Sequence, residues 1–215
     1  PDAVPRLHTG AVFERNMRLI RGVPAEANSM AAKGRMALII VDMENDFVKG
    51  ALKCERASKI VPNIQKLVKA ARSAGVPVIY SNDAHLPGLD HEFSVWGEHA
   101  LAGSQGAQVI DEIRPEKGDF VVPKRTYSGF YQTDLELLLR DLGVRTIILT
   151  GLHTNICIRH TAADAFFRGL KIVVPEDGVE AFLEKDHVAG LEYLKMAYRA
   201  EITTTDKLLG RMKPK

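Results

Sequence analysis

The chain has 215 residues, which is enough for one α/β domain with a full hydrophobic core. A net charge of +2 without a basic stripe or cluster gives no support for nucleic-acid or membrane partners. Two widely spaced cysteines, Cys54 and Cys157, suggest neither a disulfide framework nor a thiolate metal site. No segment approaches the ~20 apolar residues that cross a bilayer, so we expect a cytoplasmic protein.

Residues 1–35 stand outside any regular alternation, and we expect them to form an N-terminal arm or short helix before a domain spanning residues 36–215. In that domain, short apolar runs predict six strands, at 36–41, 76–81, 120–122, 145–150, 171–174 and 200–203. Helical periods separate them, with ends at Gly75, Gly143 and Gly169 and a start at Asp186. This alternation predicts a Rossmann-like, three-layer α/β/α fold with a central, mostly parallel six-stranded sheet.

Polar residues that carry chemistry follow four successive strands of this predicted sheet. Asp42 ends the first strand, Asp83 and His85 follow the second, Lys124 follows the third, and Cys157 follows the fourth. Ligands of open α/β sheets bind outside the carboxyl ends of the strands. We therefore expect these side chains to converge on one crevice, although they are far apart in sequence.

Cys157 is the candidate nucleophile because it lies one turn into a predicted helical run, just past the end of a buried strand. Free N–H groups and the helix dipole at that point favour a thiolate, and the same N–H groups can hold an oxyanion. Asp42 can take the thiol proton, and Lys124 can stabilise both the carboxylate and the thiolate. Taken singly, each residue has an ordinary structural explanation, so the prediction depends on their combination.

A second group, on the long irregular stretch of residues 83–114, has the residue types of a metal site. Asp83 and His85 are two residues apart, so an extended segment points both side chains the same way, and His91 and His99 can complete the set. Oxygen with several imidazoles suits a divalent transition metal, zinc ahead of iron or manganese. Ordinary loop histidines remain the alternative, and no organic cofactor is indicated.

Several motifs, taken in order over residues 36–204, resemble the isochorismatase-like cysteine hydrolases, which include nicotinamidases and N-carbamoylsarcosine amidases. The motifs are 37–47 (ALIIVDMENDF), 83–85 (DAH), Lys124 with 127–130 (YSGF) and 133–135 (TDL), and 150–157 (TGLHTNIC) with 161–165 (TAADA). The resemblance implies a catalytic triad of Asp42, Lys124 and Cys157. It also implies an oxyanion hole from the backbone N–H groups of His153 and Cys157, and a cis peptide between Leu152 and His153.

The nicotinamidase pattern of metal ligands resembles Asp83, His85, His91 and His99, and Phe47, Trp96 and Tyr127 are expected to line the substrate pocket. The sequence departs from that pattern at Ala84, Ala100 and His153, and residues 96–107 resemble the N-carbamoylsarcosine amidase branch instead. The resemblance therefore leaves the substrate open between these branches.

These observations predict a thiol amidohydrolase that releases ammonia from a small carboxamide or ureido compound through a thioester, and the resemblance implies a homodimer or homotetramer. An isochorismatase-type hydrolase of another small metabolite is one alternative. A catalytically silent binding or scaffold protein would be expected to lack a triad residue, and this chain has all three. A redox-active thiol protein would need Cys54 to fold over the crevice as a resolving cysteine.

Overall fold

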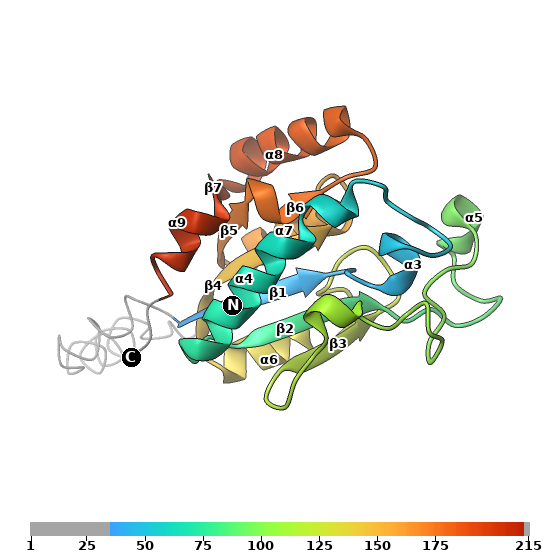
Figure 1. Cartoon of the computed structure of the whole chain (residues 1–215), viewed down its shortest axis with the longest axis horizontal. Coiled ribbons are helices and arrows are strands. Elements are labelled where there is room, and N and C mark those ends of the chain that lie inside the picture. The colour runs from blue at the N-terminus through green and yellow to red at the C-terminus, as the bar shows by residue number, and fades with distance from the viewer. Residues whose placement is uncertain (1–34, 213–215) are drawn as a thin grey trace, which may run out of the picture. The chain divides into compact units, whose positions relative to one another are not determined.

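The structure, a computed structural model, describes residues 35–212, and a parallel β-sheet forms the centre of this part (Figure 1). The strands are β1 (Arg35–Val41), β2 (Val78–Asp83), β3 (Phe120–Lys124), β4 (Val144–Leu152), β5 (Lys171–Pro175), β6 (Val179–Glu180) and β7 (Glu201–Thr203). Their order is β3-β2-β1-β4-β5-β7, β6 pairs with β4, and all these pairs are parallel. The predicted parallel sheet is confirmed. The additional strand, β6, is too short for periodicity to predict.

Helices cover both faces of the sheet, which confirms the three-layer prediction. They are α3 (Asn45–Val48), α4 (Val61–Ser73), α5 (Phe93–Trp96), α6 (Leu135–Asp141), α7 (Cys157–Phe167), α8 (Glu184–Tyr198) and α9 (Thr205–Leu209). Short 3-10 turns lie at 57–59, 111–113 and 176–178. Among residues 35–212, no helix is long and apolar enough to cross a membrane.

The alternation of side chains along β1 divides the core into two layers. Leu38 and Ile40 join the cluster that α4 and α9 cover, whereas Ala37, Ile39 and Val41 join the cluster that α6, α7 and α8 cover. Figure 1 shows α4 crossing one face of the sheet, with α6 on the other side. Because both faces of the central strands are buried, the middle residues of β1 and β4 are apolar, and the buried polar residues of β2 and β4 lie towards the carboxyl ends.

Most predicted strand boundaries differ from the structure by one or two residues. Strand β2 runs to Asp83, two residues further than predicted, because its pairing with β3 continues to the level of Lys124. Helix α8 begins at Glu184 rather than at Asp186. The predicted N-terminal arm lies outside the described residues except for Arg35, which begins β1.

Gly151 of β4 lets the two central strands approach closely at the edge where the polar residues gather. Its φ is +103°, and a Cβ atom there would lie 2.0 Å from the carbonyl oxygen of Val41. Only glycine combines this backbone conformation with such an approach. The contact fixes the end of β1 against β4, and therefore fixes the starting point of the chain segment that carries Asp42.

Candidate active site

Asp42 follows the last residue of β1, near the centre of the sheet. Its φ of 52° is in the left-handed region, which aspartate tolerates better than most residues with a Cβ atom. The backbone N–H donates to the Ser81 carbonyl at 3.2 Å, so the residue stays tied to β2 as the chain leaves the strand. Burial and the Asp83 carboxylate raise the pKa of the Asp42 carboxyl group to about 7, although Lys124 acts to lower it.

Lys124 ends β3, and the parallel register places it beside Asp83 of β2. Its Nζ atom donates an aligned hydrogen bond to Oδ1 of Asp83 at 2.5 Å and lies 3.0 Å from Oδ2 of Asp42 as an ion pair. Burial alone would lower the pKa of the ammonium group, but the two carboxylates raise it well above its ordinary value. Lys124 is therefore positively charged, and it offsets part of the negative charge in a buried site.

Cys157 is the first residue of α7, and its buried thiol interacts with the Asp42 carboxylate. Burial raises the pKa of the thiol well above its ordinary value, and Asp42 and Asp83 raise it further against the effect of Lys124. We expected the helix terminus to favour the thiolate, but burial outweighs it, so the resting thiol keeps its proton. Because the pKa of Asp42 is near neutral, this carboxylate is suited to accept that proton during a reaction.

The structure therefore brings together the three residues that the sequence predicted as a triad, from the ends of β1 and β3 and the start of α7. Sequence analysis missed a fourth group, Glu44, which is fully buried and whose Oε2 accepts a hydrogen bond from the Asp83 N–H at 3.2 Å. Burial and the carboxylates of Asp42 and Asp83 raise the pKa of Glu44 well above its ordinary value. The signal available in the sequence was the position of Glu44, two residues after Asp42, which places a second carboxylate close to the predicted site.

The segment between β4 and α7 carries the predicted oxyanion-binding groups. The peptide bond between Leu152 and His153 is cis. Thr154 donates its N–H to the Glu180 carbonyl, and Ile156 donates to the His153 carbonyl. Within residues 35–212, the N–H groups of His153 and Cys157 find no carbonyl acceptor, so both can donate to a developing oxyanion beside the thiol.

Four buried side chains, Asp83, His85, Glu92 and His99, form a group that can hold a metal ion, because one ligand atom from each lies within 4.8 Å of the others. Nε2 of His85 and Nε2 of His99 lie 3.5 Å and 3.8 Å from Oδ2 of Asp83. Nδ1 of His85 bonds to Asp90 at 2.9 Å, and Nδ1 of His99 bonds to the Gly97 carbonyl at 2.8 Å. These outer contacts orient both Nε2 atoms towards the shared carboxylate, which is how metal-binding histidines are held.

Two buried ligand atoms without partners among residues 35–212 further support a divalent transition metal at this group. Nε2 of His85 and Oε1 of Glu92 are buried without a hydrogen-bond partner in the described part of the chain. Unpartnered buried polar atoms are unfavourable, and a bound cation would satisfy both. Two imidazoles with two carboxylates suit zinc, iron or manganese.

His91 does not join this group, which corrects the predicted ligand set. Its side chain is exposed, and its carbonyl accepts hydrogen bonds from the N–H and hydroxyl of Ser94, as part of the turn that leads into α5. The turn presents the neighbouring side chain, that of Glu92, to the interior instead. The sequence carries no signal that distinguishes Glu92 from other acidic residues, because the geometry of this loop does not follow from periodicity.

A narrow pocket leads to Cys157. The predicted residues Phe47, Trp96 and Tyr127 line it, together with residues that the sequence did not single out for it: Leu52, Ile156 and Phe182. Nε1 of Trp96 donates to the Tyr127 hydroxyl at 3.0 Å, which fixes the indole in the wall. The metal-ligating candidates Asp83, Glu92 and His99 face the same pocket. Nucleophile, candidate metal site and aromatic walls therefore share one cavity.

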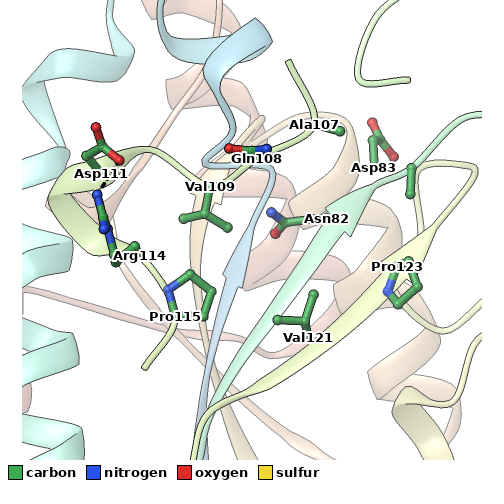
Figure 2. A pocket seen from close by; sticks show the side chains of 11 residues that line it. Asn82, Asp83, Ala107, Gln108, Val109, Asp111, Arg114, Pro115, Val121 and Pro123 are labelled. Atoms are coloured by element: carbon green, nitrogen blue, oxygen red, sulfur yellow. Dashed lines mark hydrogen bonds and ion pairs between the residues drawn. The ribbon is translucent and has the colours of Figure 1, made fainter. Parts of the chain in front are cut away.

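A separate depression of about 520 Å³ lies over β2 and β3 (Figure 2). Figure 2 shows the side chains of Asn82, Val121 and Pro115 turned towards it, with Arg114 and Asp111 at one side. Of the described residues, neither Cys157 nor Asp42 lines it. Its greater size does not make it the catalytic pocket, because the thiol and its base lie elsewhere.

The second cysteine has a structural position. The Cys54 thiol is buried and donates to the Ala181 carbonyl at 3.4 Å. Burial raises the pKa of this thiol, which keeps it in the less reactive protonated form. A hydrogen-bonded thiol of raised pKa is poorly suited to the resolving role that the redox alternative requires.

Fold and site together define a three-layer α/β protein with a cysteine, a carboxylate and a lysine gathered at the carboxyl edge of a parallel sheet. The sequence matches the Isochorismatase domain over residues 36–207, and the chain belongs to this family. The resemblance inferred from the motifs is thereby confirmed.

Relatives and solved structures agree with this assignment. The chain is 33% identical over 188 residues to the uncharacterized isochorismatase family protein YaaI of Bacillus subtilis (strain 168), covering 84% of this chain and 99% of the relative. It is 30% identical to ureidoacrylate amidohydrolase RutB of Pseudomonas syringae pv. syringae (strain B728a), covering 86% and 84%.

Among solved structures, it is similar to N-carbamoylsarcosine amidase from Thermoplasma acidophilum, with 43% identity, a TM-score of 0.76, and coverage of 80% of this chain and 97% of that one. It is also similar to nicotinamidase PncA from Bacillus subtilis, with 32% identity, a TM-score of 0.75, and coverage of 79% and 99%. Three of these four relatives are amidohydrolases by name, which agrees with the predicted enzyme class, a hydrolase of C–N amide bonds.

Proposed function

We propose that this protein is a thiol amidohydrolase that releases ammonia from a small carboxamide or ureido compound. The observation that carries the proposal is the buried group of Cys157, Asp42 and Lys124 beside a pocket with aromatic walls. The similarity to N-carbamoylsarcosine amidase, nicotinamidase and ureidoacrylate amidohydrolase supports an amide or ureide as the substrate.

In the first half of the reaction, Asp42 takes the proton of the Cys157 thiol as the sulfur attacks the substrate carbonyl. The oxyanion accepts hydrogen bonds from the backbone N–H groups of His153 and Cys157. Asp42 then returns the proton to the leaving nitrogen, the C–N bond breaks, and ammonia departs. The carbonyl carbon remains bound to sulfur as a thioester.

In the second half, a water molecule attacks the thioester. Asp42 accepts a proton from this water and passes one to the departing sulfur, which regenerates the Cys157 thiol and releases the acid product. Lys124 stays protonated throughout, because two carboxylates hold its charge. Its role is to stabilise the charge that alternates between Asp42 and Cys157.

We propose that Asp83, His85, Glu92 and His99 hold a divalent transition metal, with zinc ahead of iron or manganese. When bound there, such an ion orients the substrate or lowers the pKa of a water molecule. Asp83, Glu92 and His99 line the same pocket as the nucleophile, so they also exclude bulk water from one side of the substrate.

The proposed setting is the cytoplasm, with the protein acting as a homodimer or homotetramer on a small molecule. One observation supports the setting: both cysteines are free in the structure. The proposed mechanism agrees with it, because a cysteine nucleophile has to stay reduced. Size-exclusion chromatography with light scattering tests the oligomeric state, and a monomer at working concentration would contradict it.

A screen for ammonia release tests the proposed function. The purified chain is incubated with nicotinamide, pyrazinamide, N-carbamoylsarcosine and ureidoacrylate, with and without added zinc, iron or manganese. We expect release from at least one of these compounds. The second product is the carboxylic acid for a carboxamide, and a carbamic acid, which breaks down to the amine and carbon dioxide, for a ureido compound. Absence of release from all four under every metal condition would contradict the proposal.

A further inference from the structure

His153 contributes more to the pocket than its backbone N–H. Its imidazole lines the pocket beside Cys157, although the side chain is only 2% exposed. Nε2 of this ring is buried and has no hydrogen-bond partner among the described residues. A buried polar atom without a partner is unfavourable, and at the wall of a binding pocket it indicates a group that a ligand completes.

Aromatic neighbours hold the imidazole ring of His153 in place. Phe182 stacks on it with ring centroids 4.0 Å apart and an interplanar angle of 25°. Phe47 meets it edge to face at 5.7 Å. Burial lowers the pKa of the imidazole to about 3, so the ring is neutral at neutral pH and offers one nitrogen as acceptor and one as donor. The ring is thus a fixed, uncharged hydrogen-bonding group.

Phe182 also covers the pocket. It stacks on Trp96 at a centroid distance of 6.0 Å, so the aromatic ring bridges two walls. With Phe182 in this position the pocket has room for about one water molecule. An amide substrate is several times larger, so the pocket has to widen, and movement of the partly buried Phe182 would widen it beside His153. That movement would uncover the face of the His153 ring on which Phe182 stacks.

The segment that carries Phe182 has anchors on its N-terminal side. The Ala181 carbonyl accepts from the Cys54 thiol, and Glu180 pairs with Arg56 at 3.0 Å. These contacts hold the backbone before Phe182, so movement of its side chain need not unfold the segment. His153 and Thr154 are held on the opposite side, where Thr154 donates to the Glu180 carbonyl.

We propose that the His153 imidazole is a specificity-determining residue, which stacks on the planar part of the substrate in place of Phe182 and hydrogen-bonds a polar group outside the scissile amide. The inference rests on the proposed function and narrows its substrate class. The preferred substrate is a small, flat amide or ureide that carries a second polar group. An amide of the same size without that group binds more weakly.

Two variants of similar size test this role. His153→Gln keeps a polar atom near the position of Nε2, and His153→Leu removes it. Both are assayed on the compound from the ammonia screen that the wild-type protein hydrolyses fastest, with KM and kcat measured separately. Thermal unfolding of both variants checks that the fold is retained, and Phe182→Leu serves as a control that removes the covering ring but keeps the imidazole.

We expect His153→Leu to raise KM by about tenfold with kcat changed less than about threefold, as loss of one hydrogen bond to a bound substrate predicts. His153→Gln should recover most of the loss. A KM unchanged in His153→Leu, or an equal rise in both variants, would overturn the inference while leaving the proposed function intact. If the wild-type protein hydrolyses none of the compounds, the proposed function fails, and this inference fails with it.

Discussion

Lys124 donates a 2.5 Å hydrogen bond to Oδ1 of Asp83, and this contact joins the catalytic group to the candidate metal site. The other oxygen of Asp83, Oδ2, faces the Nε2 atoms of His85 and His99. Burial would raise the pKa of Asp83, but Lys124 and His85 hold it below its ordinary value. The Asp83 carboxylate therefore stays ionised between Lys124 and the candidate metal site. Because its negative charge raises the pKa of Asp42, a change in the charge of the metal site would also alter that pKa.

Replacing Cys157 with Ala should abolish ammonia release on every substrate that the wild-type protein accepts, because no sulfur remains to form the thioester. Cys54→Ser is the matched control, since it removes the other thiol while its hydroxyl can keep the hydrogen bond to the Ala181 carbonyl. The assay measures ammonia and the acid product. Turnover retained by the Cys157 variant would reject the nucleophile assignment.

Asp42→Asn should reduce kcat by at least the ~10²- to 10⁴-fold typical of a lost general base, since an amide cannot accept the Cys157 proton. In the wild-type protein, kcat/KM should fall about tenfold per pH unit as the pH drops below about 7. The sign follows from the pKa of Asp42, about 7: below it, the carboxyl group is protonated and cannot act as a base. An acid limb centred near pH 4 would show that Asp42 has an ordinary pKa.

Most of this fold was predictable from the sequence because its strands are apolar on both sides and its helices end at glycines. The triad was predictable for the same reason: strand ends are visible in the sequence, and parallel strands place their ends at one edge. Glu92 and Phe182 were not predictable, because their positions depend on how long loops fold over the sheet. Sequence periodicity does not show which side of the turn before α5 faces inward. The sequence therefore predicts His91 as a metal ligand, whereas the structure buries Glu92 at the site and leaves His91 exposed.

Glu92→Gln and His91→Gln distinguish two candidate sets of metal ligands: the set predicted from the sequence, with His91, and the set that the structure brings together, with Glu92. Glu92 lies within 4.8 Å of the other ligand atoms, and Oε1 has no protein partner among the described residues, so its loss should weaken metal binding by at least tenfold. His91 is exposed, and its loss should leave the metal content unchanged. Elemental analysis after dialysis measures both. Loss of metal in the His91 variant but not in the Glu92 variant would support the ligand set predicted from the sequence, with His91 as a ligand.

Asp90→Asn tests the outer contacts of the same site. Asp90 receives His85 Nδ1 at 2.9 Å and the Leu86 N–H at 3.0 Å, and Arg125 pairs with it from outside. Loss of the carboxylate should let the His85 ring turn, and should weaken metal binding by about 10- to 100-fold. Metal titration followed by the unfolding temperature measures the change. Identical midpoints for variant and wild-type protein across the titration would show that the contact does not orient the ligand.

Gly151→Ala tests whether the close approach of β4 to β1 is needed, because it places a Cβ atom 2.0 Å from the Val41 carbonyl oxygen in addition to the strain of a positive φ. Gly75→Ala isolates the strain of a positive φ, since Gly75 has φ of +66° and nothing within 4 Å of its added Cβ atom.

The Gly75 variant should lose about 1 kcal/mol of unfolding free energy. The Gly151 variant should lose roughly 3 kcal/mol or more, and the displaced end of β1 should lower kcat by moving Asp42. Urea unfolding measures the free energies. Equal losses in the two variants would mean that β1 and β4 can separate at this point without penalty, and that the position of Asp42 is fixed by its other contacts.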